Sequence, residues 1–234
     1  MKKIIILSAV VALFVSCMSE IKTKIKLKGY RFQNEYAVSD SIESEKLTKD
    51  ITIDIYLILH TYPDSWTNVV AKMKSDSECE FCFRIKDSKK GQFFFGDGTD
   101  KHSVYFVTDE IFELDTWQRI TLVRDMGKGE LKIYANGELK AKKTLEEEEI
   151  RGPEPTNSPI YVGSIYIKGR DMTIADVKIW CKVMSDNEIL KGWEEIKNPD
   201  TEESLVTYWS FEDLDDNRVE NLAGSDLTLT IKEK

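Results

Sequence analysis

Paired cysteines are the residues whose spacing most directly suggests chemistry. Cys79 and Cys82 stand in the string ECEFCFRI with the CxxC spacing of redox and zinc sites. The alternation around them predicts a strand with Cys79 and Phe81 on one face and Cys82 on the other. A thioredoxin-like motif begins a helix instead, and a zinc site needs more ligands than two histidines would add. We expect buried free thiols, with a disulfide to Cys181 as the alternative.

Carboxylates offer a second chemistry, the binding of a hard cation. The string GDGTD supplies Asp97 and Asp100, and its glycines would let backbone carbonyls converge as a Ca²⁺ site requires. The string EDLDDN supplies more acidic residues over 213–217, without the spacing of an EF-hand. Aspartate and glycine also form plain turns, which is the alternative for both strings. Asp97 and Asp100 are therefore the candidate Ca²⁺ ligands, and Ca²⁺ is the cofactor that the sequence suggests.

The N-terminus, MKKIIILSAVVALFVSC, has the parts of an export signal. Two lysines precede an apolar stretch that is too short for a stable membrane span. FVSC resembles the lipobox of bacterial lipoproteins, with Phe14 in place of the usual leucine. The resemblance implies that Cys17 is acylated and anchors the chain in the bacterial cell envelope, on its periplasmic or its outer side; an ordinary signal peptide is the alternative. We expect a signal peptide over residues 1–16 and a polar tether over 17–29.

The charge of the chain limits its partners. The formal net charge is −9, which disfavours nucleic acid, because phosphates require a basic surface. After the signal, no apolar run is long enough for another membrane span. Residues 30–234 have a length that suits one large β-domain, with a core that needs neither a disulfide nor a metal to fold.

Short alternating segments fill most of this region. In ITIDIYLILH, residues 51–60, every second side chain is aliphatic, which predicts a strand with one face in the core. Asn136-Gly137 in LKIYANGEL is a strong hairpin signal, because both residues tolerate positive φ. Ser185 and Glu188 match a capping box and predict one short helix near residues 186–196. The pattern indicates an all-β sandwich or jelly roll.

Three segments together resemble one family. They are DTWQRITLVRDMGKGELKIYANGELK, IYVGS followed by MTIADVKIWCKVMSDNEI, and LVTYWSFED. Their order and spacing are similar to those of the concanavalin A-like jelly roll, in its laminin-G-like and pentraxin-like branch. The resemblance covers most of residues 30–234 and implies two antiparallel sheets packed face to face. The last segment usually opens such a module, and here we expect it to pair beside the first strands of the same domain.

The enzymes of that superfamily are glycoside hydrolases with a strand resembling E-x-D-x-x-E, which carries the catalytic carboxylates. No such string occurs here, and the closest, EIFELD at residues 110–115, has the wrong order. Neither His60 nor His102 lies in a nucleophile motif. We therefore expect a protein that is not an enzyme.

Exposed aromatic residues with polar neighbours would suit carbohydrate. We expect Trp117, Trp209 and Phe211 to pack in the core, since they match core positions of the family. The candidate ligand-binding residues are Tyr56, His60, Trp66 and Tyr166. The leading hypothesis is a non-catalytic, lipid-anchored envelope protein that binds a glycan. The alternative is a structural or adhesion module that binds an envelope or host protein.

Overall fold

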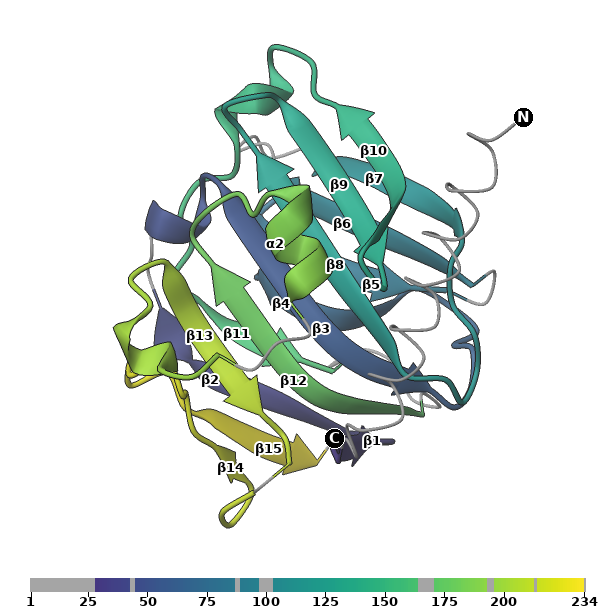
Figure 1. The fold of residues 1–234 in the computed structure, drawn as a ribbon, viewed down its shortest axis with the longest axis vertical. Helices are drawn as coiled ribbons and strands as arrows, with labels where there is room; N and C mark the ends of the chain where they lie inside the picture. The colour runs from purple at the N-terminus through teal and green to yellow at the C-terminus, as the bar shows by residue number, and fades with distance from the viewer. Residues whose placement is uncertain are drawn as a thin grey trace, which may run out of the picture.

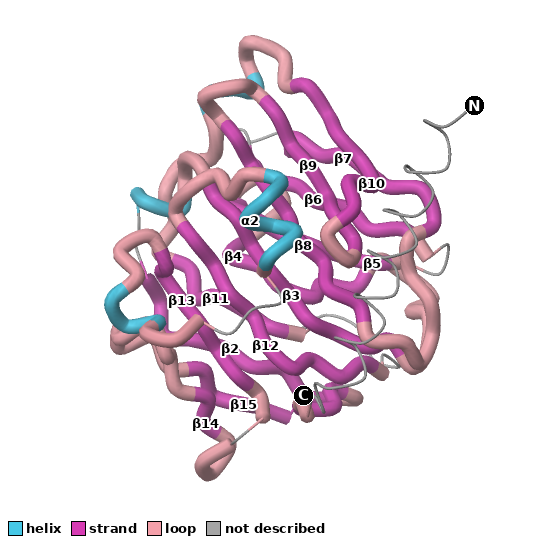
Figure 2. Tube along the Cα trace, in the orientation of Figure 1, coloured by secondary structure: helices cyan, strands magenta, loops and turns pink. Residues whose placement is uncertain are grey.

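The computed structural model describes residues 28–42, 45–86, 89–96, 103–163, 171–192, 196–212 and 214–233. These residues form two antiparallel β-sheets stacked on each other, with little helix (Figures 1 and 2). The predicted all-β jelly-roll sandwich is confirmed.

One sheet, here called sheet A, has seven strands in the order β1-β12-β3-β8-β9-β10, with β13 beside β12. Its strands are β1 (Tyr30–Phe32), β3 (Ile51–Leu59), β8 (Gln118–Asp125), β9 (Glu130–Ala135), β10 (Glu138–Thr144), β12 (Met172–Trp180) and β13 (Leu205–Ser210).

The other sheet, sheet B, has eight strands in the order β14-β15-β2-β11-β4-β5-β6-β7. Its strands are β2 (Glu35–Ile42), β4 (Thr67–Met73), β5 (Cys79–Ile85), β6 (Lys90–Gly96), β7 (Ser103–Glu110), β11 (Ser158–Val162), β14 (Arg218–Val219) and β15 (Leu229–Glu233). The helical elements are α2 (Asp186–Lys191) and the 3₁₀ turns η1 (Glu45–Leu47), η2 (Glu149–Arg151) and η3 (Pro199–Thr201).

The core lies between the two sheets and follows the predicted alternation. The aliphatic side chains of β3 that the sequence placed inward are all buried there, together with Trp209 and Phe211 from the C-terminal segment. The opposite face of β3 is also covered in part, because Thr52, Asp54 and Tyr56 are buried as well. Sheet A therefore has a second packed layer on its outer face.

The predicted hairpin joins β9 to β10. Asn136 and Gly137 have φ angles of 54° and 82°, the positive values that this tight turn requires. The hairpin is confirmed, and its role is to set the register of edge strand β10 on β9.

Helix α2 lies on the outer face of sheet A (Figure 1). The predicted capping box is confirmed: the Ser185 hydroxyl accepts from the backbone N–H of Glu188, and the Glu188 carboxylate accepts from the backbone N–H of Ser185. The helix ends at Lys191, earlier than predicted. Its last turn meets the guanidinium of Arg119, which donates to the carbonyl of Ile189.

The C-terminal segment belongs to the same sandwich. β13 pairs with β12 in sheet A, and β15 pairs with β2 in sheet B. The LVTYWSFED segment, which forms β13, therefore pairs with a late strand and not with the first strands as expected, whereas β15, further along the chain, pairs with the early strand β2.

The cysteines of β5 correct one prediction. A β-bulge places Lys72 opposite Phe81 and Met73 opposite Cys79, so the alternation breaks between residues 79 and 81. Cys79 consequently lies with Cys82 in a small apolar cluster on the outer face of sheet B, apart from the main core. The expectation of buried free thiols holds for both, and Cys181 is free as well.

Candidate functional site

The outer face of sheet A carries polar and aromatic side chains in register across four strands. Direct cross-strand partners point to the same face of a sheet, so two rows can be read from the pairing. One row runs Ser210, Asp176, Tyr56, Arg119, and the next runs Tyr208, Lys178, Asp54, Thr121.

The pair Asp54–Arg119 holds this face to helix α2. Arg119 Nε donates to Asp54 Oδ2 at 2.8 Å, and the Thr121 hydroxyl donates to Asp54 Oδ1 at 2.7 Å. Both charged side chains are at most 3% exposed. Arg119 also binds the helix carbonyl of Ile189, and a side chain at Gly192 would collide with the guanidinium. We assign this pair to docking the helix.

Asp176 and Lys178 form a second ion pair on the same face. Lys178 Nζ lies 2.9 Å from Asp176 Oδ2, with 11% of the lysine and 18% of the aspartate side chain exposed. The ammonium also lies 4.7 Å from the ring centre of half-buried Tyr208. Burial raises the pKa of Asp176, and the neighbouring lysine opposes that effect. The ion pair fixes both groups, and each keeps a small exposed fraction.

An aromatic stack borders the ion pair. The rings of Tyr56 and Trp117 lie 5.2 Å apart and nearly parallel, at 18°. Tyr56 is 7% exposed, and its burial raises its pKa to about 12, whereas Trp117 is half-buried. The prediction that Trp117 packs in the core is wrong, because the ring covers the outer face of sheet A. Tyr56 supports a ring that solvent can reach.

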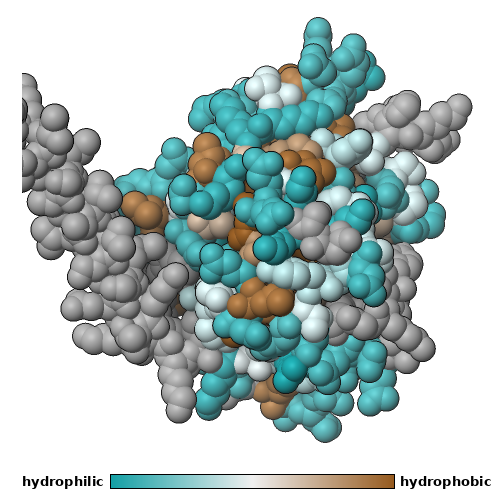
Figure 3. Space-filling view, turned by 90° about the vertical axis from the view of Figure 1, so that its right-hand side faces the viewer, coloured by the Kyte–Doolittle hydropathy of each residue, from teal (hydrophilic) through white to brown (hydrophobic). Residues whose placement is uncertain are grey.

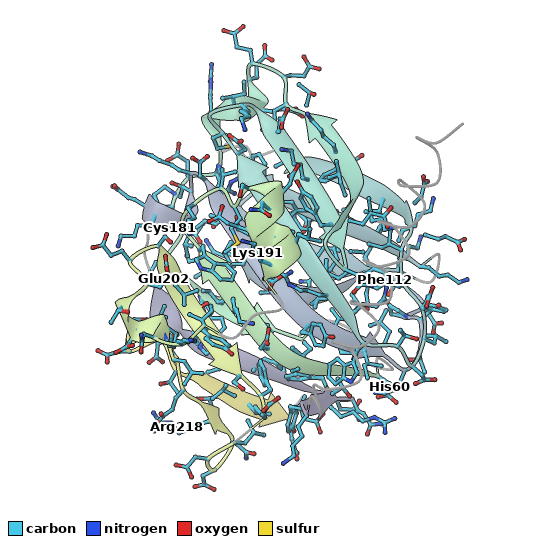
Figure 4. All side chains as sticks on the ribbon, in the orientation of Figure 1. His60, Phe112, Cys181, Lys191, Glu202 and Arg218 are labelled. Carbon is cyan, nitrogen blue, oxygen red and sulfur yellow. The ribbon has the colours of Figure 1, made fainter. Side chains whose placement is uncertain are left out.

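His60 contacts the chain segment that immediately precedes Trp117. Its Nδ1 lies 2.8 Å from Asp115 Oδ1, and its Nε2 lies 2.9 Å from Thr173 Oγ1. Asp115 has a φ of +53°, and its backbone N–H donates to the carbonyl of Leu59 at 2.8 Å. His60 directly follows β3 (Figure 4). Its contacts with Asp115 and Thr173, here called the clasp, hold the segment before Trp117 against the end of that strand.

Trp66 lies elsewhere, just before β4 of sheet B. Its ring is half-buried, with the guanidinium of Arg84 5.5 Å and the ammonium of Lys86 5.9 Å from its centre. The structure therefore brings Tyr56 and His60 to one face of β3, as predicted, and leaves Trp66 in a separate cation–π cluster.

A small cavity continues the sheet A face beneath the end of α2. Its volume is about 150 Å³, which is less than drug-sized ligands need and enough for one substituent of a sugar. Glu202, one of the residues that line it, is labelled in Figure 4. Residues lining it include Arg119, Lys178, Trp180, Lys182, Gly192 and Glu202.

Several predicted residues lie outside the described part of the chain: Cys17, Asp97, Asp100 and Tyr166. The acidic string near residue 215 is described in part, and it forms a turn in which Asp216 and Asn217 have positive φ. Among the described residues, no three His, Cys, Asp or Glu side chains gather as a metal site would require. No described helix has the length and apolar character needed to cross a membrane.

The sequence did not indicate Trp117, Asp176, Lys178 and Tyr208 as site residues. A signal was present for two of them, because Asp176 and Lys178 are the polar positions of an alternating strand. Trp117 immediately precedes β8, so the alternation within the strand does not predict which face of the sheet its side chain covers.

Solved structures with this fold include proteins that bind carbohydrate. A Bacteroides ovatus protein described as a candidate carbohydrate-binding protein is 16% identical, with a TM-score of 0.66, and covers 88% of this chain; this chain spans 60% of that one. The CBM40 of the Ruminococcus gnavus IT-sialidase, bound to α2,3-sialyllactose, is 14% identical, with a TM-score of 0.53. The match covers 71% of this chain and 97% of the CBM40 chain. The Botulinum neurotoxin DC binding domain, in complex with rat synaptotagmin II, is 15% identical, with a TM-score of 0.53. The match covers 82% of this chain and 51% of the toxin chain.

At these identities the likeness establishes the fold. A comparison with curated protein sequences gave no match. Residues 33–190 match the laminin-G-like family that is described as the Concanavalin A-like lectin/glucanases superfamily. The match covers more than half of the chain, and the two antiparallel sheets of the structure agree with the fold of this superfamily. The chain therefore belongs to it.

Proposed function

We propose that this chain binds a glycan on the outer face of sheet A. The binding surface, here called the platform, consists of Trp117 on its Tyr56 support together with Asp176, Lys178 and Tyr208. The observation that carries the proposal is the half-buried Trp117 ring stacked on a buried tyrosine beside an ordered, partly exposed ion pair.

Sugar recognition needs an apolar ring face and polar groups at fixed positions. Trp117 supplies the ring, and its stacking on Tyr56 and the clasp at His60 reduce the entropy that binding would cost. Asp176 accepts hydrogen bonds and Lys178 donates them, so the pair can serve sugar hydroxyls of either orientation. The cavity next to Lys178 would accept one substituent.

Binding without hydrolysis fits the state of the carboxylates on this face. A glycosidase needs one carboxyl group that can donate a proton and a second that acts as nucleophile or base. Asp54 is held by Arg119 and Thr121, and Asp176 is paired with Lys178. The sugar-binding proteins with the same fold support the proposal at the level of scaffold.

A glycan array tests the proposal, with Trp117→Ala as the informative variant and Trp66→Ala as its matched control. Both substitutions remove a half-buried tryptophan, but only Trp117 lies on the platform. We expect Trp117→Ala to lose the wild-type signals and Trp66→Ala to keep them. Loss in both variants, or in neither, would count against the platform.

A second candidate function is protein binding through the edge of sheet B. Edge strand β7 exposes Tyr105 by 54% and Val107 by 38%, two residues that point the same way. Figure 3 shows apolar side chains in small patches among hydrophilic ones. Strand addition at such an edge is a common mode of peptide recognition. Cross-linking from native envelopes, with Tyr105→Lys as the blocking variant, would detect such a partner.

We further propose that the chain is a lipoprotein anchored through Cys17 in a bacterial cell envelope. The apolar leader and the FVSC string support this. Metabolic labelling with a fatty acid should mark the wild type and leave Cys17→Ala unmarked. A label that persists in the variant would contradict the proposal.

A further inference from the structure

One ion pair of sheet B lies in the interior of the molecule. Lys72 of β4 and Glu80 of β5 are both 0% exposed, and Lys72 Nζ lies 2.5 Å from Glu80 Oε1. Lys72 is the direct cross-strand partner of core residue Phe81, so its side chain enters the space between the sheets. Two charges are thus withdrawn completely from water.

The bulge in β5 explains how Glu80 reaches this position. Lys72 pairs with Phe81 and Met73 pairs with Cys79, which leaves Glu80 as the extra residue of the bulge. A bulge redirects the side chain at that point of a strand. In a regular strand, Glu80 would point to the face opposite that of Phe81. The bulge instead turns Glu80 to the face that carries Phe81 and Lys72.

The hydrogen bonds to the Glu80 carboxylate are unequal. Oε1 accepts from Lys72 Nζ, from the backbone N–H of Thr156 at 2.7 Å and from the Thr156 hydroxyl at 3.1 Å. Within the described part of the chain, Oε2 is buried and has no hydrogen-bond partner. A buried carboxylate oxygen without a partner is costly, and so is the desolvation of the whole pair.

A further positive charge adds to that cost. Arg124 is fully buried, and it donates to the backbone carbonyl of Glu80 at 2.5 Å. Its guanidinium lies 5.1 Å from the ring centre of Phe95. A reaction that removed the charges of Lys72 and Glu80 would leave only Arg124 to be stabilised in this cluster, by the backbone carbonyls it already contacts.

We propose that Lys72 and Glu80 are joined by an intramolecular isopeptide bond, an amide between the lysine Nζ and the glutamate side-chain carbonyl. A proton first passes from the Lys72 ammonium to the Glu80 carboxylate. The neutral amine nitrogen Nζ then forms a bond to the carboxyl carbon, the bond from that carbon to Oε2 breaks, and Oε2 leaves as water with that proton and a second proton from Nζ. The ammonium and the carboxylate together give one amide and one water molecule. Atoms and charges balance without an oxidant, a reductant or a co-reactant.

The surrounding groups suit each stage of this reaction. The N–H and hydroxyl of Thr156 donate to Oε1 and would stabilise the negative charge that develops there during attack, as in an oxyanion hole. Oε2, which has no partner to hold it, is the oxygen that departs. Lys72 Nζ also donates to the Thr156 carbonyl at 2.6 Å, and the remaining N–H of the amide would keep that bond. Held contact in a dry site supplies the proximity that an uncatalysed condensation lacks.

Peptide mapping of the full chain tests the proposal independently of any glycan. Trypsin cleaves after lysine and arginine, and an amide on Lys72 blocks cleavage there. The wild type should release residues 50–74 joined to residues 75–84, lighter than the two peptides together by one water molecule. The solvent-exposed pair Lys182–Glu188, with Nζ and Oε1 3.4 Å apart, should give unjoined peptides and is the internal control.

Two variants sharpen the result. Lys72→Met should abolish the joined product, and Thr156→Val, which keeps the backbone N–H but loses the hydroxyl, should form it more slowly. Unjoined peptides ending at Lys72 from folded wild type, after prolonged incubation, would overturn the proposal and leave a buried ion pair. A joined product that persists in Lys72→Met would overturn it as well. The wild-type map decides the question even where a variant does not fold.

Discussion

The two sheets present outer faces of opposite character. The outer face of sheet A carries one charged pair between strands, Asp54–Arg119, and one within β12, Asp176–Lys178, and on the same face the half-buried Trp117 stacks on Tyr56. On sheet B, Cys79, Cys82 and Phe94 form a buried apolar cluster, and Arg84 lies 4.4 Å from the Phe94 ring centre. The small exposed fraction of Asp176 and Lys178 would let these groups form hydrogen bonds with a sugar. The comparison therefore favours sheet A over sheet B as the face for the proposed glycan binding.

The largest expected effect comes from breaking the buried pair of sheet A. Arg119→Met leaves Asp54 buried without its partner, and we expect a loss of about 3–5 kcal/mol in the free energy of unfolding. The matched change on sheet B, Arg84→Met, removes two cation–π contacts and one hydrogen bond to Gln92 from a side chain that is 21% exposed, and should cost about 1–2 kcal/mol. Urea denaturation measures both, and equal losses would contradict the difference between the faces.

Thiol labelling probes the sheet B cluster. Burial raises the pKa of Cys79 and Cys82, so both should react with iodoacetamide only when the strand opens. Half-buried Cys181 should react at least about tenfold faster in the folded protein. Peptide mapping over time gives the three rates. Labelling of Cys82 as fast as Cys181 would show that the cluster is open to solvent.

A smaller effect should follow from removing the cap of α2. Ser185→Ala deletes the hydroxyl that accepts from the Glu188 N–H, and such a loss costs about 1 kcal/mol. Thermal unfolding of the variant should show this, with the exposed Ser41→Ala on β2 of sheet B as a control. An unchanged melting temperature would mean that Arg119 alone holds the helix in place.

The smallest effect concerns pH and has opposite signs at two carboxylates of sheet A. Burial raises the pKa of Asp176 above its usual 3.8, so its contribution to stability is present below that pH and is lost as pH rises through the folded value. Hydrogen bonds from Lys142 and Lys132 lower the pKa of Glu130 to about 2. Its contribution is present above the usual 4.5 and is lost as pH falls toward 2.

The variants Asp176→Asn and Glu130→Gln separate these contributions. Between pH 3 and pH 6, the stability of the wild type relative to Asp176→Asn should fall as pH rises. Relative to Glu130→Gln it should fall as pH decreases. Urea denaturation across this range measures both trends, and slopes of the same sign would contradict the account.

Local patterns predicted the scaffold well. Alternation in β3, the Asn136-Gly137 turn and the Ser185 capping box each depend on residues close in sequence, and all three are confirmed. The prediction for Cys79 was wrong because one bulge residue reverses the face of every position beyond it.

The candidate site depended on contacts between distant segments. His60 meets Asp115 and Thr173, which are 55 and 113 residues away in sequence. The position of Trp117 follows from that clasp and from cross-strand register, which a single sequence does not specify. Sequence reasoning therefore pointed to the face of β3 that carries Tyr56 and His60 and missed the Trp117 ring that lies on the same face.

The most direct test of the central claim is calorimetric titration of the best glycan from the array into wild type, Trp117→Ala and Trp66→Ala. We predict that Trp117→Ala raises Kd by at least about tenfold, as expected for a stacking residue at the centre of a binding surface. Trp66→Ala should leave Kd unchanged. An unchanged Kd in Trp117→Ala, with binding lost in Trp66→Ala, would move the site to sheet B and contradict the account.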